Sequence, residues 1–202
     1  MPETTTGNVI KLSGDDVVCY VRPLKNAKTE AASLIPAQTS FEFDLKRDSD
    51  TTDTKDGGFA TSSSLETDVE VDFLNNTSKI ADQLVDSILN NEVMEIWGVV
   101  RKRRNKEGKY FSWYMRGTVS EDDNSNDSGD TSERDVSFAI SGTPQRGWTT
   151  LTDDQAAELD YVYRGLDKVT EDEDGTEITG GTPWKDEDAG TNEDVPSTQK
   201  AA

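Results

Sequence analysis

Apolar and polar side chains alternate in three segments of the chain, and this two-residue period is typical of half-buried β-strands. In 38–47 the apolar side chains fall on one face and charged side chains on the other. The apolar set is Phe41, Phe43 and Leu45. The alternation returns at 69–73 and at 135–140. Strands with one apolar face pair into an antiparallel sheet that covers a core.

Two further pairs of segments predict hairpins. The short β-branched runs 9–12 and 16–22 are separated by Ser-Gly-Asp, which is a turn signal. The aromatic-rich runs 93–104 and 109–119 are joined by the tight turn 105–108. Four consecutive basic residues, Arg101, Lys102, Arg103 and Arg104, lie at the end of the second hairpin. We interpret them as a solvated hairpin end that meets an acidic neighbour, because an acidic protein repels phosphates.

One segment has the period of a helix. Within 77–91, apolar residues recur every four positions from Ile80 through Leu84, which predicts an amphipathic helix packed on the sheet. Thr77 or Asn76 would cap its first turn, and the two asparagines at its end suit a C-terminus.

A long polar segment, 48–67, separates two of the predicted strands. It holds one aromatic residue and one leucine, so it contributes little to a core. Long loops without structure are uncommon inside compact domains and are usually functional or disordered. We therefore predict an extended hairpin arm that leaves the body of the domain.

The segment after 135–140 is rich in turn residues. Gly142, Pro144 and Gly147 are predicted to turn the chain off the sheet, and Trp148 to fill the junction between the sheet and a second helix. Arg146 is expected to pair with a carboxylate, either within the subunit or across an interface.

The last part of the chain supports little core. A helix is predicted at 152–160 with Thr152 as its cap, followed by a strand at 161–166. Residues 169–202 form an acidic tail without apolar density and 1–7 a flexible arm, and both are expected to be disordered. The sequence thus predicts one mainly β (α+β) domain: an antiparallel β-sandwich or barrel over residues 8–168, flanked by one main helix.

Charge and composition narrow the function. The 202 residues carry a net charge of −20 and no histidine, which excludes zinc sites and Ser–His or Cys–His nucleophiles. The acidic balance argues against phosphate-neutralising nucleic-acid binders and against docking on anionic membranes. The single cysteine, Cys19, lies in an apolar run and is expected to be buried. We expect no cofactor; a hydrolase with a carboxylate pair stays open.

A calcium site deserves a test in the loop 121–135. Its oxygen ligands would be Asp122, Asn124, Asn126 and Glu133. The spacing is close to that of an EF-hand loop, but Asp127 stands where that loop needs glycine, and the flanks are strand-like. The alternative function built on this loop is a β-sandwich binding module for carbohydrate or a cell-surface partner.

Two motifs carry a family resemblance. The polar arm reads DTKDGGFAT at 53–61 and SLET at 64–67, and the late segment reads QRGWTTL at 145–151. In this order, with a helix and an aromatic hairpin between them, they resemble the major tail proteins of long-tailed phages that infect Gram-positive bacteria. The resemblance covers residues 8–168.

The resemblance implies a structural protein and no enzyme. Such subunits form hexameric rings that stack into a hollow tail tube, through which double-stranded DNA passes without specific binding. The arm would contact the next ring through Asp50, Asp53, Asp56, Gly57, Gly58, Phe59 and Glu66. The late segment would be a subunit interface or a fold landmark through Gln145, Arg146, Gly147 and Trp148.

The resemblance also implies partners and a location. Besides its own copies, the subunit would meet the tape measure protein, the distal tail protein and the tail terminator protein. It would be part of the virion, in the phage tail, after assembly in the host cytoplasm, with no membrane partner.

Overall fold

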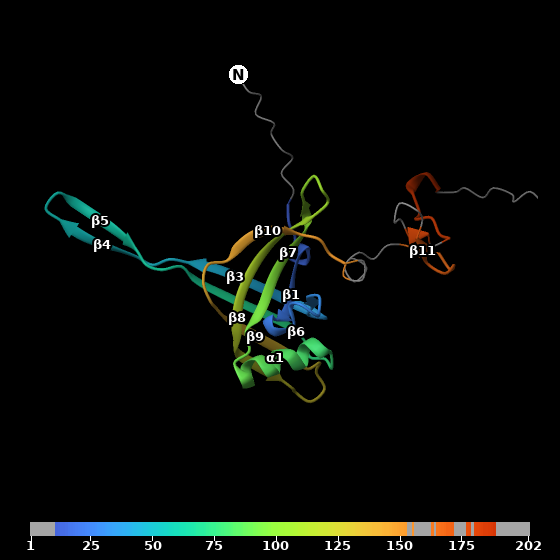
Figure 1. The fold of residues 1–202 in the computed structure, drawn as a ribbon, viewed down its shortest axis with the longest axis horizontal. Helices are drawn as coiled ribbons and strands as arrows, with labels where there is room; N and C mark the ends of the chain where they lie inside the picture. Colours follow the sequence, from blue (N-terminus) through green and yellow to red (C-terminus); the bar gives the residue numbers. More distant parts are fainter. Residues whose placement is uncertain are drawn as a thin grey trace, which may run out of the picture. The chain divides into compact units, whose positions relative to one another are not determined.

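The alternating segments form one antiparallel sheet with the order β2-β1-β7-β8-β9-β6-β3, and β10 pairs with β8 beside this path (Figure 1). The strands of this sheet are β1 (Val17–Pro23), β2 (Ser33–Leu34), β3 (Gln38–Lys46), β6 (Glu66–Leu74), β7 (Met94–Arg104), β8 (Tyr110–Ser125), β9 (Glu133–Ile140) and β10 (Gln145–Thr149). This computed structural model describes residues 11–152, 155, 163, 165–171, 177–178 and 180–188. The mainly β fold with a flanking helix is confirmed.

The long strand β8 connects the parts of the sheet. It has 16 residues and pairs with β7 along one edge. Along the other edge it pairs first with β10 and then with β9. The amide of Ser141, between those two strands, donates to the Arg116 carbonyl at 2.7 Å, so the edge stays hydrogen-bonded across the gap.

The sheet curls so that β1 and β3 come together. The Gln38 side chain accepts a hydrogen bond from the Cys19 amide at 2.8 Å and donates one to the Cys19 carbonyl at 2.9 Å. One side-chain amide thus replaces a pair of backbone bonds between the two strands. Apolar side chains from all the long strands fill the interior, including Val71, Phe73, Ile96 and Val136. Cys19 is fully buried there, as predicted, and burial raises the pKa of its thiol.

The helix α1 (Lys79–Asn90) lies across one end of the sheet (Figure 1). Ile80 and Leu84 are buried in the core, as their spacing predicts. The cap is Ser78, whose hydroxyl accepts from the Ala81 amide, so the predicted caps Thr77 and Asn76 were wrong by one or two residues. The helix ends at Asn91 in the left-handed conformation, where asparagine is tolerated.

Three predictions about the sheet were wrong. β1 pairs with β7 and β2, and the described residues of 9–12, which are 11 and 12, lie in no strand. The expected loop at 121–125 is the end of β8. The expected turn at Gly147 is the middle of β10, which pairs Gly147 with Ser112.

The chain divides into two units, 1–155 and 156–202. The second contains the two-residue strands β11 (Thr170–Glu171) and β12 (Glu177–Ile178), which pair with each other, and the 3-10 turn η3 (Asp186–Asp188). The expected tail therefore has local structure in its described part. The described positions of the predicted strand 161–166 lie in no strand. The arm 1–7 and most of the helix 152–160 lie outside the described residues.

Two further short elements flank β1, one before it and one after it. They are the 3-10 turns η1 (Gly14–Asp16) and η2 (Leu24–Asn26). Thr152 and Gln155 exchange hydrogen bonds between side chain and backbone in both directions, which is the capping box expected for Thr152. Among the described residues, no helix is both long enough and apolar enough to cross a membrane.

Gly117 offers a direct test of the close packing at the centre of β8. A Cβ atom there would lie 2.4 Å from the Ala139 carbonyl oxygen, while a Cβ atom on Gly147 would meet nothing within 4 Å. We expect Gly117→Ala to lower the free energy of unfolding by about 1–3 kcal/mol, because backbone must move. Gly147→Ala, the matched control, should change it by less than about 0.5 kcal/mol. Urea unfolding measures both, and equal effects would contradict the packing.

Candidate assembly interface

The hairpin formed by β3 and β6 continues beyond the sheet as a narrow arm (Figure 1). The arm consists of β4 (Ser49–Thr54) and β5 (Gly57–Ser62), and in the part of the chain that the structure describes these two strands pair only with each other. The predicted hairpin arm is confirmed, and it is a regular two-stranded ribbon. An isolated two-stranded ribbon is only marginally stable in water, so this one gains stability from any surface that covers it.

The joint between arm and sheet has a defined geometry. Lys46 pairs with Glu66 at the end of the sheet, and Ser49 pairs with Ser62 at the start of the arm. The intervening chain is one residue longer on the β5–β6 side, which makes a bulge and changes the direction of the strands. Ser63 holds the joint, because its amide donates to the Asp48 carbonyl at 2.8 Å and its hydroxyl accepts from the Asp48 amide at 3.0 Å.

The predicted contact residues follow the arm closely. Asp50 and Asp53 are part of β4, and Phe59 is part of β5. Asp56 and Gly57 lie at the turn, where Gly57 has a φ of +130° that favours glycine. The remaining two are Gly58, which pairs with Asp53, and Glu66, which begins β6.

The outer face of β3, β6, β9 and the end of β8 is acidic. Because the apolar residues of these strands point inward, their alternate positions point outward, and most of those are carboxylates. Glu42 stands directly opposite Glu70. Asp72 stands opposite Asp135, which itself stands opposite Asp123. Like charges opposite each other destabilise a sheet, so this arrangement is costly to the isolated subunit. We call these strands' outer surface the acidic face.

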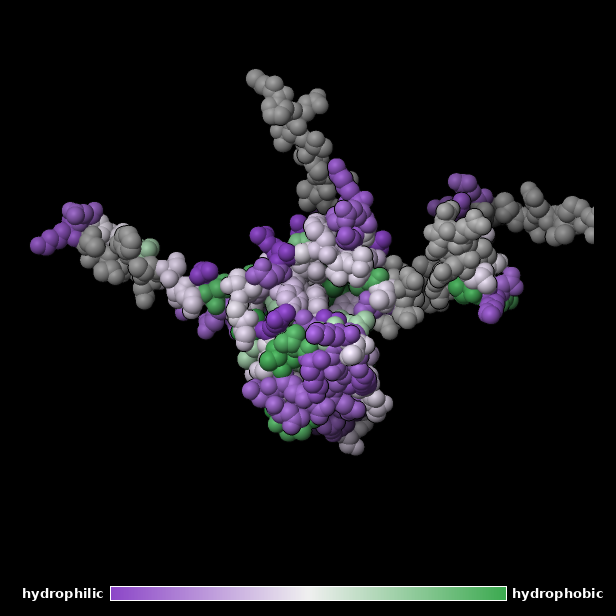
Figure 2. Space-filling view, in the orientation of Figure 1, coloured by the Kyte–Doolittle hydropathy of each residue, from purple (hydrophilic) through white to green (hydrophobic). Residues whose placement is uncertain are grey.

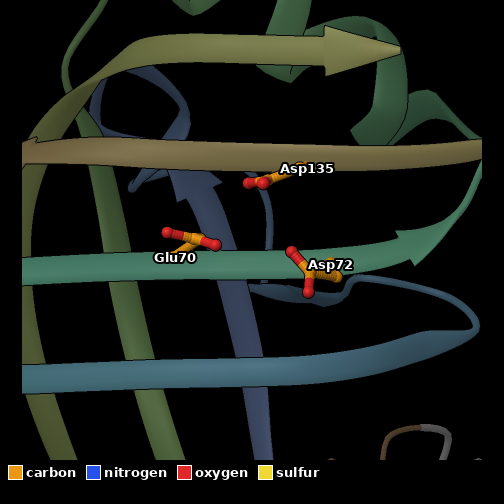
Figure 3. Close-up of side chains that lie close together, drawn as sticks. All are labelled: Glu70, Asp72 and Asp135. Atoms are coloured by element: carbon orange, nitrogen blue, oxygen red, sulfur yellow. The ribbon is translucent and has the colours of Figure 1, made fainter. Parts of the chain in front are cut away.

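Three carboxylates form the centre of the acidic face (Figure 3). Glu70 and Asp72 project from β6 and Asp135 from β9, with carboxylate oxygens within 4.8 Å of one another. Desolvation raises the pKa of all three, and neighbouring carboxylates raise it further. One oxygen of Asp72 is buried without a hydrogen-bond partner. Such a group is close enough to share a cation or a proton. Sequence analysis missed it, although the polar positions of the alternating strands carried the signal.

One lysine lies on this face near the arm. The Lys46 ammonium is 2.8 Å from an Asp68 carboxylate oxygen and 3.8 Å from one of Asp44. The hydrogen bond to Asp68 raises the pKa of Lys46, so the ammonium stays charged. The base of the arm is thereby tied electrostatically to the acidic face.

Asp122, one of the four residues proposed as calcium ligands, is already paired with a buried cation. Arg134 donates to both carboxylate oxygens of Asp122, at 2.6 and 2.5 Å, and also to the Ala81 carbonyl of α1 at 3.1 Å. Both side chains of this ion pair are buried. Asp122 therefore connects the β8–β9 hairpin to the helix. Asn124 lies in β8 and Glu133 in β9, and Asn126 accepts a hydrogen bond from the Ser132 hydroxyl in the turn.

The late segment is an edge strand. Gln145 begins β10, and Trp148 packs edge-to-face against Phe111 with ring centres 5.7 Å apart. Trp148 is 45% exposed, and most of the helix whose junction with the sheet it was expected to fill lies outside the described residues. The Arg146 guanidinium lies 5.7 Å from the centre of the Trp113 ring. No carboxylate of the described residues is within ion-pair distance of Arg146, so a carboxylate partner for it would come from elsewhere.

The acidic centre predicts an unusual pH dependence. A carboxyl group whose pKa is raised by folding binds its proton more tightly when folded, so the free energy of unfolding rises as pH falls toward that pKa. We expect the unassembled subunit to gain stability as the pH falls from neutral toward the ordinary carboxyl pKa of about 4. The carboxyl groups with lowered pKa, such as Asp16, would reverse the trend only below their ordinary range.

Asp72→Asn tests the origin of that slope. The substitution should raise the free energy of unfolding near neutral pH by about 0.5 kcal/mol and flatten its pH dependence. The control is Asp56→Asn at the exposed arm turn, which should do neither. Thermal unfolding at several pH values measures both, and an unchanged slope in Asp72→Asn would show that the cluster is not its source.

Comparison with known proteins places the chain among tail proteins. A "Putative tail protein" of Staphylococcus phage phiMR25 is 24% identical over 173 residues, covering 81% of this chain and 86% of that protein. The SPP1 tail tube protein has a similar fold, with a TM-score of 0.65 and 18% identity over 78% of this chain and 91% of that one.

A chain from the virion of a native gene transfer agent particle matches with a TM-score of 0.53 and 8% identity, over 69% of this chain and 100% of that one. The family model described as phage tail tube protein matches residues 11–146. The family resemblance seen in the sequence is therefore confirmed. The chain belongs to the phage tail tube protein family, whose members are structural proteins of the virion.

Proposed function

We propose that this chain is the subunit of a phage tail tube: it assembles into hexameric rings that stack into a hollow conduit for double-stranded DNA. One observation carries the proposal. A domain of this family extends its β3–β6 hairpin into a ribbon that pairs with no other strand among the described residues. The subunit has no catalytic role in this account and needs no cofactor. It assembles in the host cytoplasm and ends in the tail of the virion.

The acidic face suits the wall of the conduit. Phosphates held by cationic side chains release counterions, so a basic lumen would retain the DNA. Carboxylates opposite one another on β3, β6 and β9 give the DNA no such partner. The carboxylates that repel one another across the strands also repel the phosphates, so the DNA can move past this surface without binding to it. We therefore assign the acidic face to the lumen.

The sheet also has an edge that a ring would cover. β3 is a terminal strand of the sheet path, and within the described residues Phe41 to Lys46 pair with β6 on one side only. An unpaired edge is a template for another strand, and a closed ring removes it. We propose that each ring closes through this edge and that Gln145, Arg146, Gly147 and Trp148 lie at a subunit contact.

The arm then reaches the adjacent ring. Its contact residues are Asp50, Asp53, Asp56, Gly57, Gly58, Phe59 and Glu66. The entropy lost in fixing the ribbon is offset only when a neighbour covers it, which delays polymerisation until assembly begins. At its two ends the tube would contact the distal tail protein and the tail terminator protein, and inside it the tape measure protein.

Replacing the arm tests this function. Substituting Asn-Gly for Ser49–Ser62 leaves a tight hairpin on β3 and β6, because this dipeptide forms the two-residue turn that suits paired strands. The variant should keep a folded body by circular dichroism and should lose tube formation by electron microscopy. The control is Asp86→Asn on the exposed side of α1, which keeps the whole arm and should assemble. Normal tubes from the armless chain would contradict the role of the arm.

A further inference from the structure

Basic and acidic side chains gather at opposite ends of β8. The β7–β8 hairpin end, residues 101–109, includes the last four residues of β7 and the turn, and it carries six of the 21 basic side chains and one carboxylate, Glu107. We call it the basic pole. Its cations are Arg101, Lys102, Arg103, Arg104, Lys106 and Lys109.

The opposite end of β8 has the reverse character. The β8–β9 hairpin end, residues 121–135, carries seven carboxylates, and we call it the acidic pole. They are Glu121, Asp122, Asp123, Asp127, Asp130, Glu133 and Asp135. Its one cation, Arg134, is buried against Asp122 and does not reach the surface. Figure 2 shows hydrophilic side chains over the end of the body that carries α1 and this turn.

The two poles lie at opposite ends of the body (Figure 1). β8 connects them and has 16 residues, which corresponds to about 50 Å along an extended strand. At physiological salt the Debye length is about 8 Å, far shorter than the distance between the two poles. The poles of one subunit therefore do not neutralise each other. Within the basic pole, Lys102 pairs with Asp16 and Lys109 with Glu107, each at 2.9 Å, yet the six cations outnumber these two carboxylates and the pole keeps a net positive charge.

Both poles have ordered shapes. In the basic pole the Arg103 guanidinium lies 3.9 Å from the centre of the Phe111 ring, and that of Arg104 lies 4.3 Å from the centre of the Tyr110 ring. The Asn105 side chain accepts from the Lys109 amide at 2.9 Å and fixes the turn. In the acidic pole the Ser132 hydroxyl donates to Asn126 at 2.7 Å. Preorganised charges lose less entropy when they pair.

We propose that the basic pole of one copy docks on the acidic pole of the next copy along the stack. This rests on the proposed tube and specifies which surfaces face each other between rings. A head-to-tail contact between two different patches of one chain propagates without closing, as a stacked tube requires. A duplex nucleic acid is the competing partner for the basic pole, but the net charge of −20 opposes it.

Charge reversal at each pole, alone and together, tests the pairing. The basic-pole variant carries Arg103→Glu, Arg104→Glu and Lys106→Glu. The acidic-pole variant carries Asp123→Lys, Asp127→Lys and Asp130→Lys. Each should slow tube formation at least tenfold, because like charges then face each other. The combined variant has the net charge of the unaltered chain and should assemble again, because its poles are complementary once more.

Several results would overturn the inference. The first is normal tube formation by either single-pole variant. The second is a combined variant that is folded, as thermal melting shows, but does not recover tube formation. The third is a basic-pole variant that forms normal tubes but no longer binds a short duplex DNA, because the basic pole would then serve nucleic acid. If the variants do not fold, the unaltered chain decides: tube formation should slow steeply as salt rises from about 50 to about 300 mM, and no salt dependence would contradict the pairing. An unaltered chain that forms neither rings nor tubes would instead contradict the proposed function.

Discussion

The whole domain depends on the backbone hydrogen bonds that β8 makes along both of its edges, because this strand connects β7 on one side with β9 and β10 on the other. β7 follows one edge, and β10 and β9 share the other. The exchange between these last two strands occurs beside Gly117, where the backbone of β9 approaches so closely that no side chain fits. One end of β8 adjoins the basic pole and the other end is part of the acidic pole. The strand that connects the sheet therefore also sets the distance between the two charged surfaces.

A second constraint is the repulsion on the acidic face. The carboxylates of β3, β6 and β9 face one another across strands, and the apolar residues beneath them, such as Val69 and Val71, hold the sheet together from the other side. Natural sheets usually avoid like charges at opposing positions. Their presence here lowers the stability of the isolated sheet, and the proposed position at the lumen gives this surface a use. The arm and the basic pole are separate from the acidic face, whereas the acidic pole continues that face at the β8–β9 hairpin end, where Asp123 and Asp135 belong to both.

Much of this fold is readable from the sequence, and the failures have physical causes. The strands β3 and β6 and the helix α1 were predictable, because each buries one apolar face with a regular period. The partner of β1 was not, since a short β-branched run does not encode which strand it pairs with. The end of β8 looked like a loop because its exposed edge is made of Asp, Asn and Ser, and β10 was hidden by Gly147, which an edge strand tolerates. The acidic face needed the register between strands, which a single sequence does not contain.

The central claim is that copies of this chain build a hollow tube. The most direct measurement is electron microscopy of the purified full chain at rising concentration, together with light scattering, in the presence and absence of the tail initiation complex of a phage that encodes it. The account predicts hollow tubes of stacked rings with a central channel. A chain that remains monomeric at every concentration, even with the initiation complex, would contradict it.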